Sequence, residues 1–306
     1  MKRAFIFLCV GFFIVNFSAA QSSNIRFTII PDILRPGDPV TVAVDSPAKN
    51  VTLLSGGKQR AKSAFFIVPA EDQKPAFMAA IITIPSLVDP GPATLRIELE
   101  SGAIRDVSIS IEPREFRSET IRLSPAMSAI VSDPDPQKTD EAKLLWSILG
   151  YSGNEIYHSG PFAMPITSTR RTSIFGTRRV YQYPDGKRTT SVHEGVDFGA
   201  PAGTPVFSCG AGKVALARPR IVTGNTIIIE HAPAVYALYY HLERIDVKEG
   251  DLIETGTQIG AVGSTGFSTG PHLHWEIRVS GENTDPDEFA KRPVLDKDLL
   301  LSRINK

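Results

Sequence analysis

Short runs in which apolar and polar residues alternate fill the chain from residue 24 to about residue 113. Alternation with a period of two is typical of strands that bury one face. Turn residues such as Arg35-Pro36-Gly37-Asp38 separate the runs at the spacing of a β-sandwich. Six runs are expected to be strands, at residues 25–30, 40–44, 64–68, 77–84, 93–99 and 107–111. The pattern predicts an immunoglobulin-like β-sandwich over residues 24–113.

The residue pattern changes after the sandwich. Residues 114–160 are expected to form a connector with one helix, capped by Thr139 and ending at Leu149 before Gly150. The prolines at 134 and 136 are expected to stop regular structure before that helix. Glycine-rich strands and turns then run over residues 161–290, which are expected to form an antiparallel-β domain, and residues 291–306 are expected to form a short charged tail. The chain is therefore predicted to be mostly β.

The first twenty residues have the three parts of a secretory signal peptide. Lys2 and Arg3 precede an apolar run at 4–15, and Ser18-Ala19-Ala20 supplies small residues for cleavage. About twelve apolar residues are too few to cross a bilayer, which needs about twenty. No later stretch is long and apolar enough to span a membrane. We therefore expect export to the periplasm or cell envelope, with no membrane span after signal removal.

Composition excludes some classes of partner and some means of stabilisation. The 306 residues include 33 Lys and Arg and 33 Asp and Glu, so no basic excess favours nucleic acid as a partner. Removal of the signal peptide takes away Cys9 and leaves Cys209 as the only cysteine. An intrachain disulfide is then impossible, and folding must depend on core packing or on a bound metal.

Five of the six histidines lie between residues 193 and 274, and three of them fall in local patterns. His193 and Asp197 are four residues apart, a spacing that returns to one face of a strand or helix. His272 and His274 share one face of a strand, with Leu273 on the other. Zinc in hydrolytic sites takes three protein ligands and keeps a fourth position for water. These residues therefore predict a zinc site.

Glu194 is not expected to act as the general base. The helical zinc protease motif that uses such a glutamate needs a second histidine where this chain has Asp197. In an extended segment, Glu194 would also point away from its neighbours His193 and Asp197.

Four ordered segments of the sequence resemble the lysostaphin/LytM-type zinc endopeptidases, which cleave peptides of bacterial peptidoglycan. They are 193–206 (HEGVDFGAPAGTPV), 239–242 (YYHL), 247–251 (VKEGD) and 263–277 (GSTGFSTGPHLHWEI), and the resemblance covers about residues 162–289. It implies zinc ligation by His193, Asp197 and His274, and catalysis by His241 and His272. Because some family members have lost ligands and act only as activators of other wall hydrolases, the complete set favours an enzyme.

The sequence leaves several alternatives open. A noncatalytic wall-binding regulator, with its metal site closed by the connector or the sandwich, is the second hypothesis. The division of work between His241 and His272 is open, as are the oligomeric state and the bond cleaved, a D-Ala to diaminopimelate link or a glycine bridge. Residues 178–190 are read as a variable loop from which Tyr181 or Tyr183 could reach the site. His231 is expected to be structural.

Overall fold

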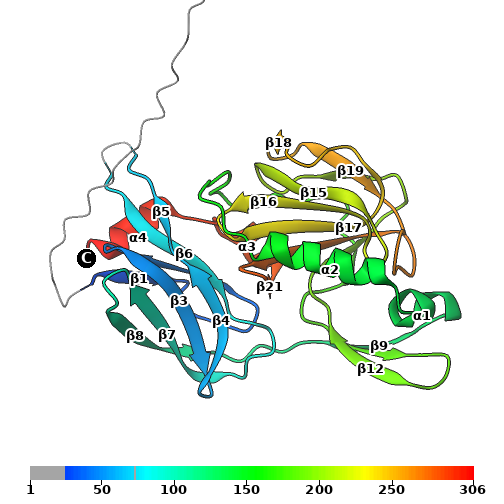
Figure 1. Cartoon of the computed structure of the whole chain (residues 1–306), viewed down its shortest axis with the longest axis horizontal. Coiled ribbons are helices and arrows are strands. Elements are labelled where there is room, and N and C mark those ends of the chain that lie inside the picture. The colour runs from blue at the N-terminus through cyan, green and yellow to red at the C-terminus, as the bar shows by residue number, and fades with distance from the viewer. Residues whose placement is uncertain (1–24, 72–73) are drawn as a thin grey trace, which may run out of the picture.

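The computed structural model describes residues 25–71 and 74–306 of the chain. The predicted signal peptide, residues 1–20, lies outside the described residues. The described part is mostly β, as the sequence predicts, with two sheet-rich units side by side (Figure 1). Within it, no helix has both the length and the apolar character needed to cross a membrane.

The amino-terminal unit is a pair of four-stranded antiparallel sheets. In spatial order, the first sheet contains β1 (Phe27–Ile30), β2 (Pro39–Val44), β6 (Phe77–Thr83) and β5 (Phe66–Val68). The second contains β4 (Lys58–Ala64), β3 (Ala48–Ser55), β7 (Gly91–Leu99) and β8 (Ile104–Ile111). Side chains such as Val42, Val51 and Leu95 form one buried cluster between the sheets. The prediction of an amino-terminal β domain is confirmed.

A hairpin of β3 and β4 lies outside the six strands expected from the sequence. The β4 residues are mostly polar, so their alternation produces no apolar run, and only Ala61 and Ser63 are buried. The turn between the strands uses Gly56 and Gly57, both with positive φ, as two-residue hairpins of the I′ type require. The glycine pair at the turn therefore indicates this hairpin more clearly than the alternation of apolar and polar residues does.

Strand β6 of the first sheet is buried on both faces, because one face packs against the second sheet and the other against the second unit. All seven residues of β6 are buried. Ala79 and Ile81 belong to the same apolar cluster as Phe289 and Leu301 from the carboxyl-terminal end of the chain. The expected tail contains α4 (Lys297–Ile304), which contacts β1 and β2 after the short helix α3 (Pro286–Lys291). The two units therefore share a hydrophobic core.

The second unit is built on a large antiparallel sheet, as predicted. Its main path contains β10 (Arg171–Ser173), β13 (Val196–Gly199), β20 (His272–Val279), β17 (Val235–Ile245), β16 (Gly224–Ala232), β15 (Gly212–Arg220) and β18 (Leu252–Ile253). Three further strands extend it, β14 (Pro205–Phe207), β19 (Gln258–Val262) and β21 (Glu282–Thr284). Strand β20 lies between β13 and β17, which places the histidine-bearing segments next to one another.

The connector differs from the expectation of a single helix. It contains β9 (Ser118–Arg122), α1 (Pro125–Ser132) and α2 (Pro136–Leu149). The helix expected from Thr139 begins at Pro136, because a proline is tolerated in the first helical turn and the Asp135 side chain accepts a hydrogen bond from the backbone N–H of Gln137. Pro125 begins α1 in the same way, with Ser124 as its cap. Regular structure does stop between Ser132 and Pro136, as expected, but Pro136 itself begins the second helix.

Both ends of the connector are attached to the second unit. Helix α2 lies across the sheet (Figure 1), where its Leu149 joins a cluster with Leu216 and Tyr236. Strand β9 pairs in parallel with β11 (Arg178–Gln182), which forms a hairpin with β12 (Arg188–Val192). Residues 178–192 are thus a regular hairpin with a short turn, and the expectation of a loop over 178–190 was wrong.

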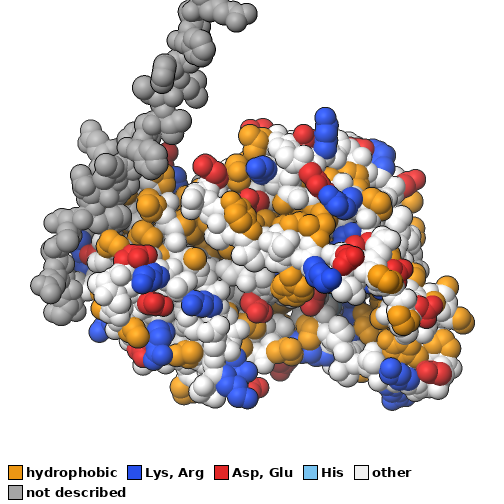
Figure 2. Space-filling view, in the orientation of Figure 1, with side chains coloured by type: hydrophobic (Ala, Val, Ile, Leu, Met, Phe, Trp, Pro, Cys, Tyr) orange, Lys and Arg blue, Asp and Glu red, His pale blue; other side chains and the backbone are white. Residues whose placement is uncertain are grey.

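Charged side chains of both signs are scattered over the face of the molecule in Figure 2. This distribution agrees with the balanced composition of the whole chain. It offers no single-sign surface on that face of the kind that drives binding to nucleic acid.

Candidate metal centre and active site

Three predicted ligands are brought together by strand register and one bend. Asp197 in β13 pairs directly with His274 in β20, so both side chains leave the sheet at the same point. His193 lies just after β12, and the chain turns at Gly195 before β13 begins. A Cβ on Gly195 would collide with the backbone carbonyl of Trp275, so this close passage requires glycine. The extended segment is therefore shorter than expected and starts at Val196.

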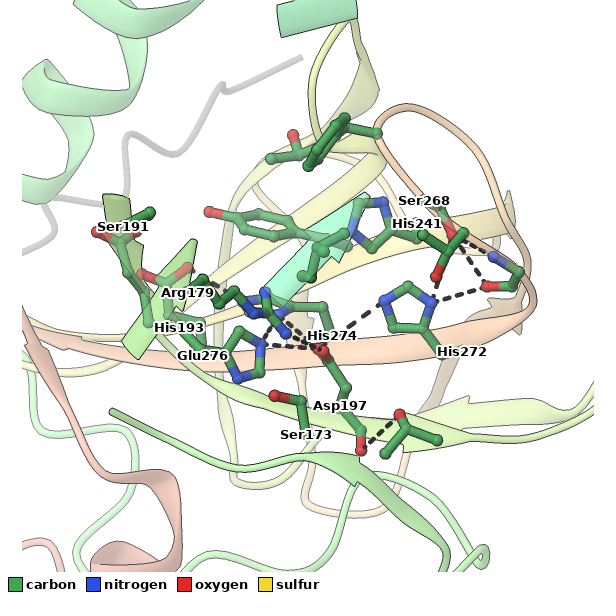
Figure 3. Close-up of a pocket in the computed structure, with 18 of the residues that line it drawn as sticks. Ser173, Arg179, Ser191, His193, Asp197, His241, Ser268, His272, His274 and Glu276 are labelled. Carbon is green, nitrogen blue, oxygen red and sulfur yellow. Dashed lines mark hydrogen bonds and ion pairs between the residues drawn. The ribbon is translucent and has the colours of Figure 1, made fainter. Parts of the chain in front are cut away.

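The three side chains converge on one point (Figure 3). His193 Nε2 lies 3.0 Å from Asp197 Oδ1 and 3.1 Å from His274 Nδ1, and His274 Nδ1 lies 2.8 Å from Asp197 Oδ1. Two atoms bound at about 2.0 to 2.1 Å to a tetrahedral zinc lie roughly 3.3 Å apart. The donor set and its spacing therefore fit a zinc ion.

Each ligand is oriented by a further contact. His193 Nδ1 donates to the carbonyl of Ile174 at 3.0 Å, which leaves the Nε2 lone pair toward the other two side chains. Asp197 accepts from Arg179 Nη2 through its second oxygen, Oδ2, at 3.1 Å. His274 turns Nε2 toward Glu276, 3.6 Å from Oε2. Outer partners of this kind fix the tautomer and the rotamer of a metal ligand.

The protonation states of the three ligands also favour a bound cation. Burial alone would raise the pKa of Asp197, but hydrogen bonds from His193 and His274 hold it well below its usual range. Burial acts to lower the pKa of His274, yet the carboxylates of Asp197 and Glu276 raise it to about 9. Burial lowers the pKa of His193. A cation is thus favoured at the convergence point, and a bound metal would displace the proton of His274.

The two predicted catalytic imidazoles face the same cavity. His272 Nδ1 donates to the carbonyl of Gly270 at 2.8 Å, and its Nε2 lies 3.8 Å from Asp197 Oδ1. His241 Nδ1 donates to the carbonyl of Thr265 at 2.8 Å. The ring centroids of the two histidines are 4.8 Å apart. Both imidazoles therefore donate a hydrogen bond from Nδ1–H to a backbone carbonyl, which leaves Nε2 as a hydrogen-bond acceptor.

Strict alternation along the strand would place Tyr239 and His241 on one face, but the structure places them on different faces. His241 has φ of 62°, a left-handed conformation that breaks the alternation of β17. Tyr239 points into the main core, whereas Tyr240 stacks on the ring of His274 with centroids 5.3 Å apart. A backbone irregularity of this kind cannot be read from the side-chain pattern, and it turns His241 toward the cavity.

The cavity has a volume of about 650 Å³ and is lined by parts of the second unit and the connector. The connector supplies Glu119, Ile121 and Met127. Glu119 accepts from Arg179 Nε at 2.6 Å and thereby supports the guanidinium that contacts Asp197. Tyr181 also lines the cavity and contacts the ring of Phe267, whereas Tyr183 does not line it. No described residue of the sandwich lines the cavity, so the described structure does not support closure of the site by that domain.

Glu194, His231 and His158 make contacts other than with the converging ligand atoms. Glu194 lines the cavity, and its carboxylate forms an ion pair with Arg278 at 2.8 Å. His231 is fully buried and bonds the carbonyl of Ala211 through Nδ1 at 2.8 Å. His158 packs against His231 and Phe162, outside the cavity, and so does not cover the metal site.

Cys209 is fully buried, and its burial raises the pKa of the thiol to about 12. A protonated thiol is a poor metal ligand, because metals bind the thiolate. We expect Cys209→Ser to retain the zinc content and turnover of the parent protein, with a modest fall in stability. Metal analysis and peptidoglycan digestion of both proteins test this. A large loss of zinc in the folded variant would make Cys209 part of the metal centre.

Comparison with known proteins gives one family match. Residues 191–286 match the model of Peptidase family M23. The match confirms the family resemblance indicated by the sequence motifs.

Three relatives illustrate how far the similarity extends. The DD-carboxypeptidase/endopeptidase Mpg of Neisseria meningitidis is 38% identical over 139 residues, 45% of this chain and 31% of that protein. Peptidoglycan DD-endopeptidase ShyB of Vibrio cholerae is 44% identical over 93 residues, 30% of this chain and 22% of that protein. An uncharacterized metalloprotease of Buchnera aphidicola is 35% identical over 160 residues, 52% and 41% of the two chains. The chain thus spans less than half the length of these curated relatives.

A solved structure is similar over both units. The crystal structure of a putative peptidase M23 from Pseudomonas aeruginosa has a TM-score of 0.53, and the alignment covers 84% of this chain and 94% of that chain. The two sequences are 24% identical, so the similarity concerns the fold.

Proposed function

We propose that this chain, which belongs to peptidase family M23 through residues 191–286, is an exported zinc endopeptidase that hydrolyses peptide bonds in bacterial peptidoglycan. The observation that carries the proposal is the convergence of His193, Asp197 and His274 beside two imidazoles that keep Nε2 toward the same cavity. A regulator without catalysis would need neither imidazole. Peptidoglycan as substrate is supported by the names of the relatives, and export by the amino-terminal signal pattern.

Zinc is the cofactor that the donor set supports, with His193, Asp197 and His274 as its ligands. When bound, it would act as a Lewis acid on the scissile carbonyl and lower the pKa of water toward about 7. Arg179 and Glu276 hold two of the ligands in place through Asp197 Oδ2 and His274 Nε2. The ligands are buried and preoriented, so little rearrangement is needed when the metal enters.

His272 and His241 supply the proton transfers. His272 presents Nε2 on the side of Asp197 and can accept the proton of the attacking water. Burial, together with the charges of the neighbouring histidines, lowers the pKa of His241 to about 3 in the metal-free chain, so its imidazole is neutral at physiological pH. Its Nε2 can therefore accept a hydrogen bond from water or from the substrate amide. We assign the role of general base to His272 and a positioning contact with water or substrate to His241.

The experiment that tests the proposal measures peptide release from purified peptidoglycan. The mature chain should contain about one zinc, release peptides, lose activity with a chelator and regain it with added zinc, because His193, Asp197 and His274 form the one converging group of metal ligands among the described residues. Mass spectrometry of the new termini identifies the cleaved bond. A zinc-loaded, folded protein that releases no peptide would instead be the noncatalytic regulator, and a protein that takes up no zinc would exclude the metal site.

A further inference from the structure

Two arginines line the cavity, and they differ in whether they have an ionic partner. Arg179 contacts both Glu119 and Asp197. Arg170 is exposed, and within residues 25–71 and 74–306 no carboxylate oxygen lies within the 4.0 Å ion-pair distance of its guanidinium. It thus provides the cavity with a positive charge that has no ion-pair partner among the described residues.

The backbone of Arg170 is held firmly against β13. Its carbonyl accepts from the N–H of Gly199 at 2.9 Å, and its own N–H donates to Ser168 Oγ at 3.3 Å. Ser168 Oγ in turn donates to the carbonyl of Gly199 at 2.8 Å. These three bonds fix the point at which the side chain leaves the backbone.

Gly199 provides the space in which the guanidinium lies. A Cβ built on Gly199 would be 2.7 Å from Arg170 Nη1, closer than side-chain carbons approach other atoms. Gly199 follows Asp197 by two residues in β13, so that missing Cβ points to the same side of the sheet as the Asp197 carboxylate. The guanidinium therefore lies on the face of the sheet that carries the Asp197 carboxylate, where it lines the cavity.

Arg170 lies at a distance from the metal ligands that would let it bind a peptide group close to the scissile bond. Two strand residues span roughly 6.6 Å, which separates the Gly199 position from Asp197. Gly199 also pairs directly with His272, so Arg170 lies beside the proposed general base. An extended peptide advances about 3.3 to 3.6 Å per residue. A group bound by Arg170 therefore belongs to a residue within about two positions of the scissile bond.

We propose that Arg170 is a specificity residue that binds a free carboxylate next to the scissile bond. This inference rests on the proposed function and narrows its substrate class. A guanidinium pairs with carboxylate through two parallel N–H groups, a geometry that a neutral amide cannot match. An amide bond to one amine of diaminopimelate leaves a carboxylate on the same carbon, whereas a glycine bridge carries none. The site is therefore suited to the D-Ala to diaminopimelate link.

The experiment compares two synthetic D-alanyl-diaminopimelate peptides, identical except that the carboxylate beside the scissile amide is free in one and amidated in the other. Calorimetry on the chelator-treated mature chain measures binding without turnover, and kcat/KM is measured on the zinc-loaded chain. Because Arg170 is exposed, the charge-assisted bond should give the carboxylate peptide an advantage of about twofold to fivefold. High salt should reduce this advantage, because Arg170 is exposed.

Two substitutions and a control identify the residue responsible. Arg170→Gln should bind the two peptides equally, and Gly199→Ala should act in the same direction because its methyl group displaces the guanidinium. Arg171→Gln should keep the full preference, since the adjacent Arg171 pairs with Asp287 and does not line the cavity. Arg170→Lys should retain part of the preference.

The outcomes separate this inference from the proposed function. Equal binding of the two peptides by the parent chain, or binding of neither, overturns the carboxylate site. A preference that survives in Arg170→Gln also overturns it, as does a preference lost in Arg171→Gln to the same extent. A chain that discriminates between the peptides by calorimetry but never cleaves them would keep the carboxylate site and refute the peptidase.

Discussion

His274→Ala should yield a folded protein without zinc, whereas His272→Ala should yield a zinc-loaded protein that turns over about 10² to 10⁴ times more slowly. The two residues share one face of β20, but only His274 places a nitrogen among the converging ligand atoms, 2.8 Å from Asp197 Oδ1. His272 Nε2 stands farther back, at 3.8 Å. Zinc content by metal analysis and release of peptides from peptidoglycan, measured on both variants, test the assignment.

His158→Ala is the matched control, because it removes an imidazole that packs outside the cavity. It should retain both zinc and turnover. The assignment of roles is reversed if His272→Ala is the zinc-free protein and His274→Ala keeps its metal. A loss of zinc in both variants would mean that His272 is a ligand too, and the proposed general base would then have to be His241.

Part of this arrangement could be predicted from the sequence, because short-range patterns encode it. The pair His272 and His274 lies on one strand face because side chains alternate, and the structure has a strand at this place. The family resemblance implied that His274 and Asp197 bind the same metal. In the structure these two residues lie directly opposite each other on neighbouring strands. The roles of these residues stay predictions until the variants are measured.

The supporting residues could not be predicted from local patterns. Glu119 reaches the cavity because β9 pairs with β11, about sixty residues farther along the chain, and the polar sequence of β9 gives no sign of that pairing. Arg179 then bridges Glu119 and Asp197. Glu276 is the exception. It follows His274 by two residues in the same strand, so alternation alone could have placed it behind that ligand.

Glu276→Ala should destabilise the metal-free protein by about 3 to 5 kcal/mol, the range found when one partner of a buried ion pair is removed. Glu276 is 1% exposed and bonds Arg278, whose side chain is itself 8% exposed. Attraction to Arg278 and the bond to His274 overcome burial and keep the pKa of Glu276 below its usual value, so the carboxylate is charged. Denaturant unfolding of the chelator-treated parent and variant measures the difference in the free energy of unfolding.

Glu249→Ala gives the matched control for this network. Glu249 also pairs with an arginine, Arg218, but their side chains are 39% and 47% exposed. An exposed pair contributes about 0 to 1 kcal/mol, so this variant should unfold almost like the parent. A similar small change for Glu276→Ala would show that water or Glu194, which also bonds Arg278, replaces the lost carboxylate.

Loss of Glu276 should also lower the affinity for zinc, and this effect can be measured separately from the free energy of unfolding. Glu276 Oε2 lies 3.6 Å from His274 Nε2, the nitrogen on the far side of the ring from the predicted metal-binding Nδ1. Removing such an outer partner typically costs tenfold to a hundredfold in metal affinity or activity. Zinc titration under conditions in which both proteins are folded should therefore show weaker binding for Glu276→Ala and an unchanged affinity for Glu249→Ala. Equal zinc affinity in the two variants would limit Glu276 to supporting Arg278, and contacts with Asp197, His193 and the stacked ring of Tyr240 would then suffice to orient His274.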